Sequence, residues 1–170
     1  MAVHIVRATP SDVALIQRVA NVTWPVAFRE ILSPEQIRYM MSWMYDTASL
    51  IEQMTQGGHV FLLAMDESEA VGFASYQVDH PEPGMTKVHK IYVLLDRQGG
   101  GVGRQLLDHV CACARDRRQR VVTLNVNRFN RAVKFYERYG FRTVRSEDVD
   151  IGGGFFMNDF VMELGVGAGE

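Results

Sequence analysis

A run of glycines between an apolar segment and a helix-forming segment constrains the fold most strongly. Four of the six residues from 98 to 103 are glycine, residues 91–95 before them are apolar, and a helical pattern follows over 102–118. Glycine lets the backbone turn sharply because it carries no Cβ. The first amides of a helix have no partner within it, and the helix dipole makes that end positive. The pattern predicts a strand, loop and helix that bind a phosphate or diphosphate, with Arg104 adding a charge-assisted hydrogen bond.

Two nucleotide-binding motifs do not fit the spacing of this loop. A P-loop needs a lysine and a Ser or Thr after its last glycine, and this loop has neither at that point. A dinucleotide-binding loop needs a third glycine where this chain has Leu106, and its ribose-binding acid would fall in the apolar pattern of residues 121–126. A flexible glycine-rich turn without a ligand is the alternative to an anion-binding loop.

The rest of the chain alternates between strand-like and helix-like patterns. Ser33 and Pro34 indicate a helix start, and Gly140 is placed to end a helix. We expect strands at 5–8, 59–65, 70–79, 86–95, 121–126, from 141 and at 155–164, and helices at 9–20, 33–44, 50–54, 102–118 and 131–139. This order predicts one mixed α/β domain over residues 1–170, with a frayed tail at 165–170.

Composition and charge narrow the class of protein. A chain of 170 residues with 47% hydrophobic and 22% charged residues has the balance of one soluble globular domain. Its formal net charge of -2 argues against a nucleic-acid partner, and no apolar run approaches the ~20 residues that span a bilayer. Residues 1–9 have a strand-like pattern rather than that of a signal peptide, so we expect a cytoplasmic protein with no membrane partner.

The cysteines and histidines do not form a metal-binding pattern. Cys111 and Cys113 are two apart on the expected helix and point away from each other, so they neither pair easily nor make a zinc site alone. The five histidines show no metal-ligand spacing. We expect no metal, and two cysteines that are buried or half-buried.

The glycine loop resembles the first signature of the GCN5-related N-acetyltransferase (GNAT) family. That signature is Arg or Gln, two residues, Gly, one residue, and Gly or Ala, and here it is Gln98, Gly101 and Gly103 at the same spacing. The segment Ile91-Tyr92-Val93 before it is similar to the family's fourth strand.

A second motif about 30 residues later strengthens the resemblance. It consists of Asn130, then Tyr136-Glu137, two residues, and Gly140-Phe141. Asn130 stands six residues before Tyr136, where many members of the family have seven. The core resemblance covers residues 60–141, and the expected first strand and helices extend it to nearly the whole chain.

The resemblance implies a mixed, mostly antiparallel sheet of six to seven strands, flanked by helices and splayed between the fourth and fifth strands. It implies acetyl-CoA as co-substrate in that gap, with its diphosphate on the glycine loop and its pantetheine arm along the fourth strand. The residues implied to bind it are Ile91, Tyr92, Val93, Gln98, Gly99, Gly100, Gly101, Val102, Gly103, Arg104, Asn130 and Tyr136.

The implied chemistry needs an acid and a base. Tyr136 matches the family's general acid, which protonates the leaving thiolate, because a phenol with a pKa of ~10 keeps its proton at neutral pH. The acceptor must lose a proton, since an alkyl amine with a pKa of ~10.4 is mostly cationic. Two alternatives stay open for the base: His89 on the fourth strand, and a chain of waters.

The acceptor is expected to be a primary amine of a small molecule, with a polyamine as one candidate. Most aromatic residues of the early helices should lie in the core, and the others, with nearby acids, would wall an amine pocket: Trp24, Phe28, Tyr39, Trp43 and Tyr45. The alternatives are a protein N-terminal or lysine acetyltransferase and a non-catalytic module that binds acyl-CoA. Relatives in this family are often homodimers, which makes a homodimer an expectation here as well.

Overall fold

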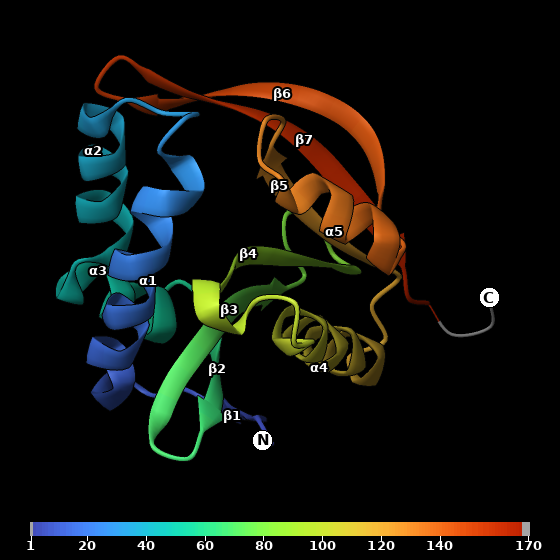
Figure 1. Ribbon diagram of the computed structural model, residues 1–170. Helices are drawn as coiled ribbons and strands as arrows, with labels where there is room; N and C mark the ends of the chain where they lie inside the picture. The colour runs from blue at the N-terminus through green and yellow to red at the C-terminus, as the bar shows by residue number, and fades with distance from the viewer. Residues whose placement is uncertain (1, 168–170) are drawn as a thin grey trace. The chain divides into compact units, whose positions relative to one another are not determined.

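The computed structural model describes residues 2–167, and Figure 1 shows their helices and strands. The strands are β1 (His4–Arg7), β2 (Val60–Asp66), β3 (Glu69–Val78), β4 (Met85–Val93), β5 (Val121–Asn127), β6 (Arg142–Gly152) and β7 (Phe155–Gly165). The α-helices are α1 (Val13–Phe28), α2 (Pro34–Tyr45), α3 (Thr47–Thr55), α4 (Val102–Asp116) and α5 (Ala132–Tyr139). Two short 3-10 helices, η1 (Pro10–Asp12) and η2 (Leu95–Arg97), precede α1 and follow β4.

The strands form one sheet of seven in the order β1-β2-β3-β4-β5-β7-β6. β2 pairs antiparallel with β1 and β3, and β7 pairs antiparallel with β5 and β6. β4 and β5 are parallel, with residues 85–88 facing residues 121–124. The expected α/β fold with a mixed, mostly antiparallel sheet is confirmed.

The chain divides into two compact units. One contains the residues up to Gln77 together with His89–Val110, and the other contains Val78–Val88 together with the residues from Cys111 onward. The boundary crosses both β4 and α4, so each unit holds part of these two elements. The splay between the fourth and fifth strands and the single domain over residues 1–170 stay predictions.

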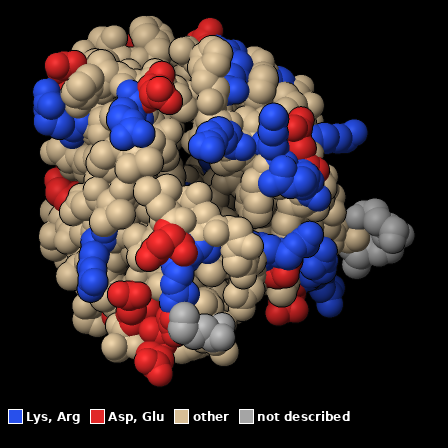
Figure 2. Space-filling model, viewed as in Figure 1, with Lys and Arg blue, Asp and Glu red and all other residues tan. Residues whose placement is uncertain are grey.

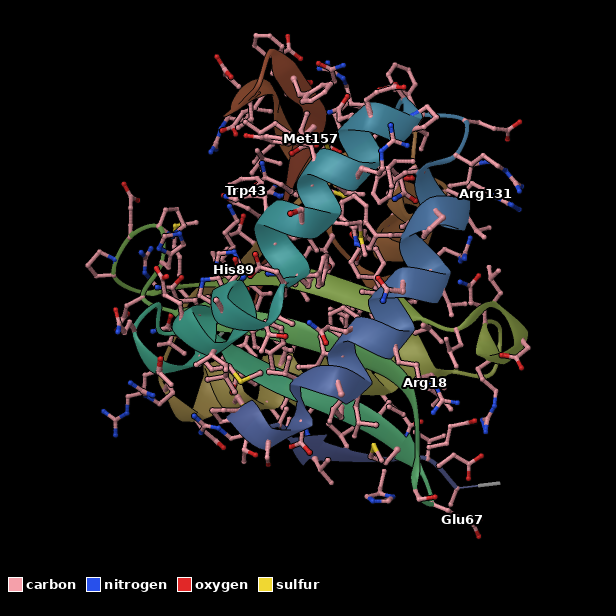
Figure 3. All side chains as sticks on the ribbon, turned by 90° about the vertical axis from the view of Figure 1, so that its left-hand side faces the viewer. Arg18, Trp43, Glu67, His89, Arg131 and Met157 are labelled. Carbon is pink, nitrogen blue, oxygen red and sulfur yellow. The ribbon has the colours of Figure 1, made fainter. Side chains whose placement is uncertain are left out.

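The core of the first unit is built on aromatic residues of α1 and α2. The two helices pack together with α3 (Figure 1). Trp24, Phe28 and Tyr45 are buried, and the Trp24 indole donates a hydrogen bond of 3.0 Å to the Tyr45 hydroxyl. Trp43, labelled on α2 in Figure 3, is 51% exposed. Three of the five early aromatic residues are therefore core, as expected, and Trp43 is at the surface.

Local signals place several helix ends. Ser33 accepts a hydrogen bond of 3.1 Å from the Gln36 amide, and Pro34 is the first residue of α2, which confirms the predicted helix start. Gly140, at a φ of +125°, ends α5 as predicted. Helix α1 continues beyond the helical spacing recognised up to Ala20, through Pro25 to Phe28, because the buried side chains of its last turns offset the hydrogen bond that proline removes.

The second unit is dominated by a long hairpin of β6 and β7, which pair over residues 142–152 and 155–163. The expected fraying from residue 165 is wrong at its first two residues. Gly165 pairs with Val121 in the sheet, and Val166 is buried with its amide bonded to the Arg120 carbonyl at 2.9 Å. Backbone pairing and burial hold this stretch in place, and residues 168–170 lie outside the described residues.

Candidate active site

The glycine loop joins β4 to α4 through η2, in the first unit. Gly99 and Gly101 have φ values of +84° and +85°, a region that favours glycine. The Gln105 amide donates to the Gly101 carbonyl at 2.9 Å, which is the first hydrogen bond of α4. The amides of the first turn therefore point out of the helix start toward the loop, where the helix dipole is positive. The predicted strand, loop and helix are confirmed, although β4 ends at Val93, before the expected residue 95.

Three contacts hold the approach to this loop. The Gln98 side chain donates to the Val93 carbonyl at 3.0 Å, and Arg97 forms an ion pair with Asp66 of β2. The Leu94 amide donates to the Val71 carbonyl at 2.9 Å. These contacts fix the backbone at the point where the chain leaves the sheet. The conformations of the glycines therefore determine the path of the loop from there to α4.

The end of β4 lies close to β3 at a glycine that the sequence reasoning missed. A Cβ at Gly72 would lie 3.0 Å from the Tyr92 carbonyl and 3.4 Å from the Val93 side chain, so only glycine fits without displacement. The Tyr92 ring packs against Trp24 and Phe73, with 5.8 Å between ring centroids in each case. Tyr92 is a packing residue through its side chain, and the half-buried Ile91 and Val93 flank it. An isolated glycine in a strand pattern was the available signal.

His89, which is labelled in Figure 3, lies on β4. Its ring stacks on that of a second histidine. The rings of His89 and His59 are 3° from parallel with centroids 4.0 Å apart. His89 Nε2 is 3.0 Å from the Gln77 amide oxygen, so in the tautomer that donates this bond Nδ1 is the basic nitrogen. Protonation of His89 would place a charge against the His59 ring.

Tyr136 is buried in the second unit, near the end of α5. Its ring packs against Phe135 and Phe141 at 5.4 and 5.8 Å between centroids, and its carbonyl accepts the Gly140 and Phe141 amides. Burial raises the pKa of the Tyr136 hydroxyl above its ordinary value. The phenol therefore stays protonated across the neutral range, as a proton donor must.

Asn130 shapes the turn that leads into α5. Its side-chain oxygen accepts a hydrogen bond of 2.9 Å from the Ala132 amide, and its own amide donates to the Asn127 carbonyl at 3.0 Å. This is the usual role of Asn at a turn, where its side chain bonds to the backbone two residues on. The predicted contact of Asn130 with CoA stays a prediction.

A row of polar side chains on four strands of the second unit was not foreseen as a group. Asn125 of β5 donates from Nδ2 to Glu147 of β6 at 3.4 Å and to Asp159 of β7 at 3.3 Å. Burial raises the pKa of Asp159, partly opposed by Asn125 and by Lys87 of β4. Burial lowers the pKa of Lys87, opposed by the charges of Glu147 and Asp159. Only the pairing of strands distant in sequence brings these four residues together.

Metal ligands do not gather within residues 2–167. No group of three or more His, Cys, Asp or Glu in that range could hold a metal ion. Cys111 is buried and Cys113 is half-buried, as expected, and neither is in a disulfide. No helix in the described part of the chain is long and apolar enough to cross a membrane. Basic and acidic side chains both occur on the face shown in Figure 2.

The strand, glycine loop and helix match a known family. Residues 28–158 match the family described as "Acetyltransferase (GNAT) domain". The chain belongs to the GNAT acetyltransferase family. The co-substrate of this family is acetyl-CoA, and the GNAT protein described here is an acetyl-CoA-dependent N-acetyltransferase.

Three known proteins illustrate the relationship. An uncharacterised N-acetyltransferase of Mycobacterium tuberculosis is 28% identical over 153 residues, which cover 89% of this chain and 96% of the relative. The 5-NmdU N-acetyltransferase of Pseudomonas phage PaMx11 is 33% identical over 129 residues, covering 74% and 86%. The crystal structure of the PaiA N-acetyltransferase of Thermoplasma acidophilum in complex with coenzyme A has a TM-score of 0.81 at 22% identity, covering 97% and 99%. At that identity the last comparison shows a shared fold.

Proposed function

We infer that this GNAT protein moves the acetyl group of acetyl-CoA directly to a primary amine of a small molecule. The observation that carries the inference is the start of α4, where two glycines with φ near +85° lead into the first helical turn. A loop of this kind presents several backbone amides to one anion, which suits a diphosphate. Residues 98–101 are exposed, so a ligand can reach them.

The rest of the co-substrate site follows from the family and the positions of its residues. The backbone of residues 98–104 would hold the diphosphate, and Arg104 would add its guanidinium. The backbone of Ile91, Tyr92 and Val93 would pair with the pantetheine arm, and Asn130 would contact CoA. Tyr92 would serve through its main chain only, because its ring is engaged with Trp24 and Phe73.

The reaction needs three proton transfers around one nucleophilic attack. A base takes a proton from the ammonium, and the nitrogen lone pair attacks the thioester carbonyl carbon. The C–S bond then breaks with its electron pair going to sulfur, the nitrogen loses a second proton, and the thiolate is protonated to give free CoA. We assign the proton donation to Tyr136. His89, through Nδ1, and a water chain are the two candidates for the base.

The acceptor is the least constrained part of the proposal. The phage relative is named for 5-NmdU, so 5-NmdU belongs among the amines to be tried, together with monoamines, diamines and polyamines. A protein N-terminus or a lysine side chain is the alternative acceptor.

Calorimetric titration with acetyl-CoA, with CoA and NAD as comparisons, tests the co-substrate, and release of CoA in the presence of the amine panel tests the transfer. We expect micromolar binding of acetyl-CoA but not NAD, and turnover with at least one small primary amine. Binding without turnover of small amines, together with labelling of proteins in a cell extract, would contradict the small-molecule acceptor. Failure to bind any CoA species would contradict the loop assignment.

A further inference from the structure

Asp159 carries a buried oxygen that has no hydrogen-bond partner in the described part of the chain. Its side chain lies on β7 and the residue is 7% exposed. Asp159 Oδ2 accepts a hydrogen bond of 3.3 Å from Asn125, whereas Oδ1 has no hydrogen-bond partner among residues 2–167. A buried acceptor without a donor costs free energy, and a buried carboxylate oxygen costs more than a neutral one. This oxygen is therefore set to accept a donor from outside the protein.

The surroundings of Asp159 combine charge with a fixed geometry. Glu147 faces Asp159 across the β6–β7 pair, and the Asn125 amide nitrogen bonds to both carboxylates at once. That nitrogen fixes the two carboxylates around a common point. Glu147 also accepts a bond of 2.9 Å from Arg145 Nε, at an exposed part of the strand.

Positive side chains of the protein act on the same carboxylate without satisfying Oδ1. Lys87 and Arg128 both favour the charged form of Asp159. Arg128 is committed to Asp148 through an ion pair of 2.6 Å. Lys87 is half-buried, and burial disfavours its charged form. A ligand cation at Oδ1 would therefore meet an anionic carboxylate. The Lys87 ammonium would compete with it for that carboxylate.

We propose that Asp159, positioned by Asn125 and accompanied by Glu147, binds an ammonium group of the acceptor that does not itself react. This assignment rests on the proposed amine acetylation. An ammonium is a charge-assisted donor, and its positive charge suits an unpartnered oxygen of a carboxylate that has a second carboxylate beside it. It restores a partner to Oδ1 and also returns the buried carboxylate to a paired state.

The ammonium that Asp159 binds cannot be the amine that is acetylated, and the reason is chemical. Nearby carboxylates favour the charged form of an amine, whereas acetyl transfer needs the neutral form with a free lone pair. A nitrogen held by Asp159 thus keeps its proton and serves as an anchor. The acceptor class that follows is a diamine or polyamine, with one amine bound here and another one acetylated.

A matched pair of amines tests this assignment in the full-length protein. 1,4-Diaminobutane and butylamine share a four-carbon chain and differ by the second ammonium. Binding of each to the CoA-saturated protein is measured by calorimetry, and kcat/KM for each is measured by CoA release. We expect the wild type to prefer the diamine by about tenfold or more, as a charge-assisted hydrogen bond provides.

Three variants separate the site from general charge effects. Asp159→Asn keeps the shape of the side chain and should reduce the preference for the diamine to within about threefold. Asp150→Asn removes a carboxylate from an exposed position of β6, keeps its bond to the Gly152 amide, and should retain the preference. Lys87→Met removes the competing ammonium and should tighten diamine binding.

The outcomes distinguish this inference from the proposed function. Equal affinity of the wild type for both amines, an unchanged preference in Asp159→Asn, or weaker diamine binding in Lys87→Met would each overturn it, even while acetyl transfer continues. Loss of acetyl-CoA binding or of all amine turnover in the wild type would instead refute the proposed function. The direct binding measurement still decides the role of Asp159 if turnover is slow.

Discussion

At the scale of single residues, the buried ionisable side chains are the most informative, because burial changes what each can do. Lys90, on the opposite face of β4 from His89, donates to the Gln53 side-chain oxygen at 2.7 Å. Its ammonium lies 5.7 and 5.4 Å from the centroids of Tyr45 and Phe61. Burial lowers its pKa to about 8, so a charged amine is held in the core at neutral pH at a cost in stability.

Lys90 should make stability depend on pH. Because its folded pKa lies below the ordinary 10.5, its charge costs about 3 kcal/mol of stability at pH 7, and this cost disappears as the pH rises from 8 toward 10.5. The free energy of unfolding in urea should therefore be higher for Lys90→Met than for wild type, and this difference should be larger at pH 7 than at pH 10. For Lys134→Met, at an exposed position, the difference in free energy of unfolding from wild type should be the same at the two pH values. A difference between Lys90→Met and wild type that stays constant from pH 7 to pH 10 would contradict the lowered pKa of Lys90 as its cause.

Tyr136 should matter for turnover and little for binding. Tyr136→Phe removes the hydroxyl and keeps the ring that packs against Phe135 and Phe141. We expect kcat to fall by about 10²-fold, the usual contribution of general acid catalysis, with the acetyl-CoA Kd near its wild-type value. Initial rates and calorimetry on the same preparation check this. Wild-type kcat in the variant would exclude Tyr136 as the acid.

The histidine stack offers a matched test of the base. If His89 is the base, His89→Ala should remove the lower pKa from the pH profile of kcat/KM, whereas His59→Ala removes only the ring stacked on His89 and should keep that pKa in the profile. Steady-state rates from pH 5 to pH 9 give both profiles. If the pH profile of His89→Ala is the same as that of wild type, the base is the water chain and not His89.

At the scale of elements, the glycine loop and α4 form the unit on which co-substrate binding depends. A Cβ at Gly101 would meet no atom within 4 Å, so substitution there acts through the positive φ and not through crowding within the protein. A Cβ at Gly100 would make ordinary contact with the Arg97 carbonyl at 3.5 Å, and its φ is not in the positive region.

Two alanine variants therefore separate backbone conformation from added bulk. Gly101→Ala should weaken acetyl-CoA binding by about tenfold, since a residue with a side chain pays about 1–2 kcal/mol in the left-handed region. Gly100→Ala should bind acetyl-CoA almost as wild type does. Calorimetric Kd values for the two variants make the comparison, and equal losses would show that the turn at Gly101 is not what shapes the site.

The predicted elements were accurate wherever a local signal existed. Ser33 and Pro34 begin α2, and Gly140 ends α5, because caps and left-handed turns depend on a few adjacent residues. The helical spacing in the sequence was recognised only up to Ala20, whereas α1 continues through Pro25 to Phe28, where the buried Trp24 and Phe28 stabilise its last turns. The length of β6 was also not predictable, since its mostly exposed residues are held in place by pairing with β7.

At the scale of the whole molecule, the sequence by itself determined the family and the co-substrate loop. Glycines, a helix start and the Tyr136-Glu137 motif lie close together in the chain, so their spacing alone carries their meaning. The tertiary structure decided the rest. Lys87, Asn125, Glu147 and Asp159 come from four strands, and only the sheet order β4-β5-β7-β6 and its register make them neighbours. The tertiary structure also decided that Trp24 is buried and Trp43 exposed, and it lowered the pKa of Lys90. The reason is that packing between distant segments determines which side chains are buried.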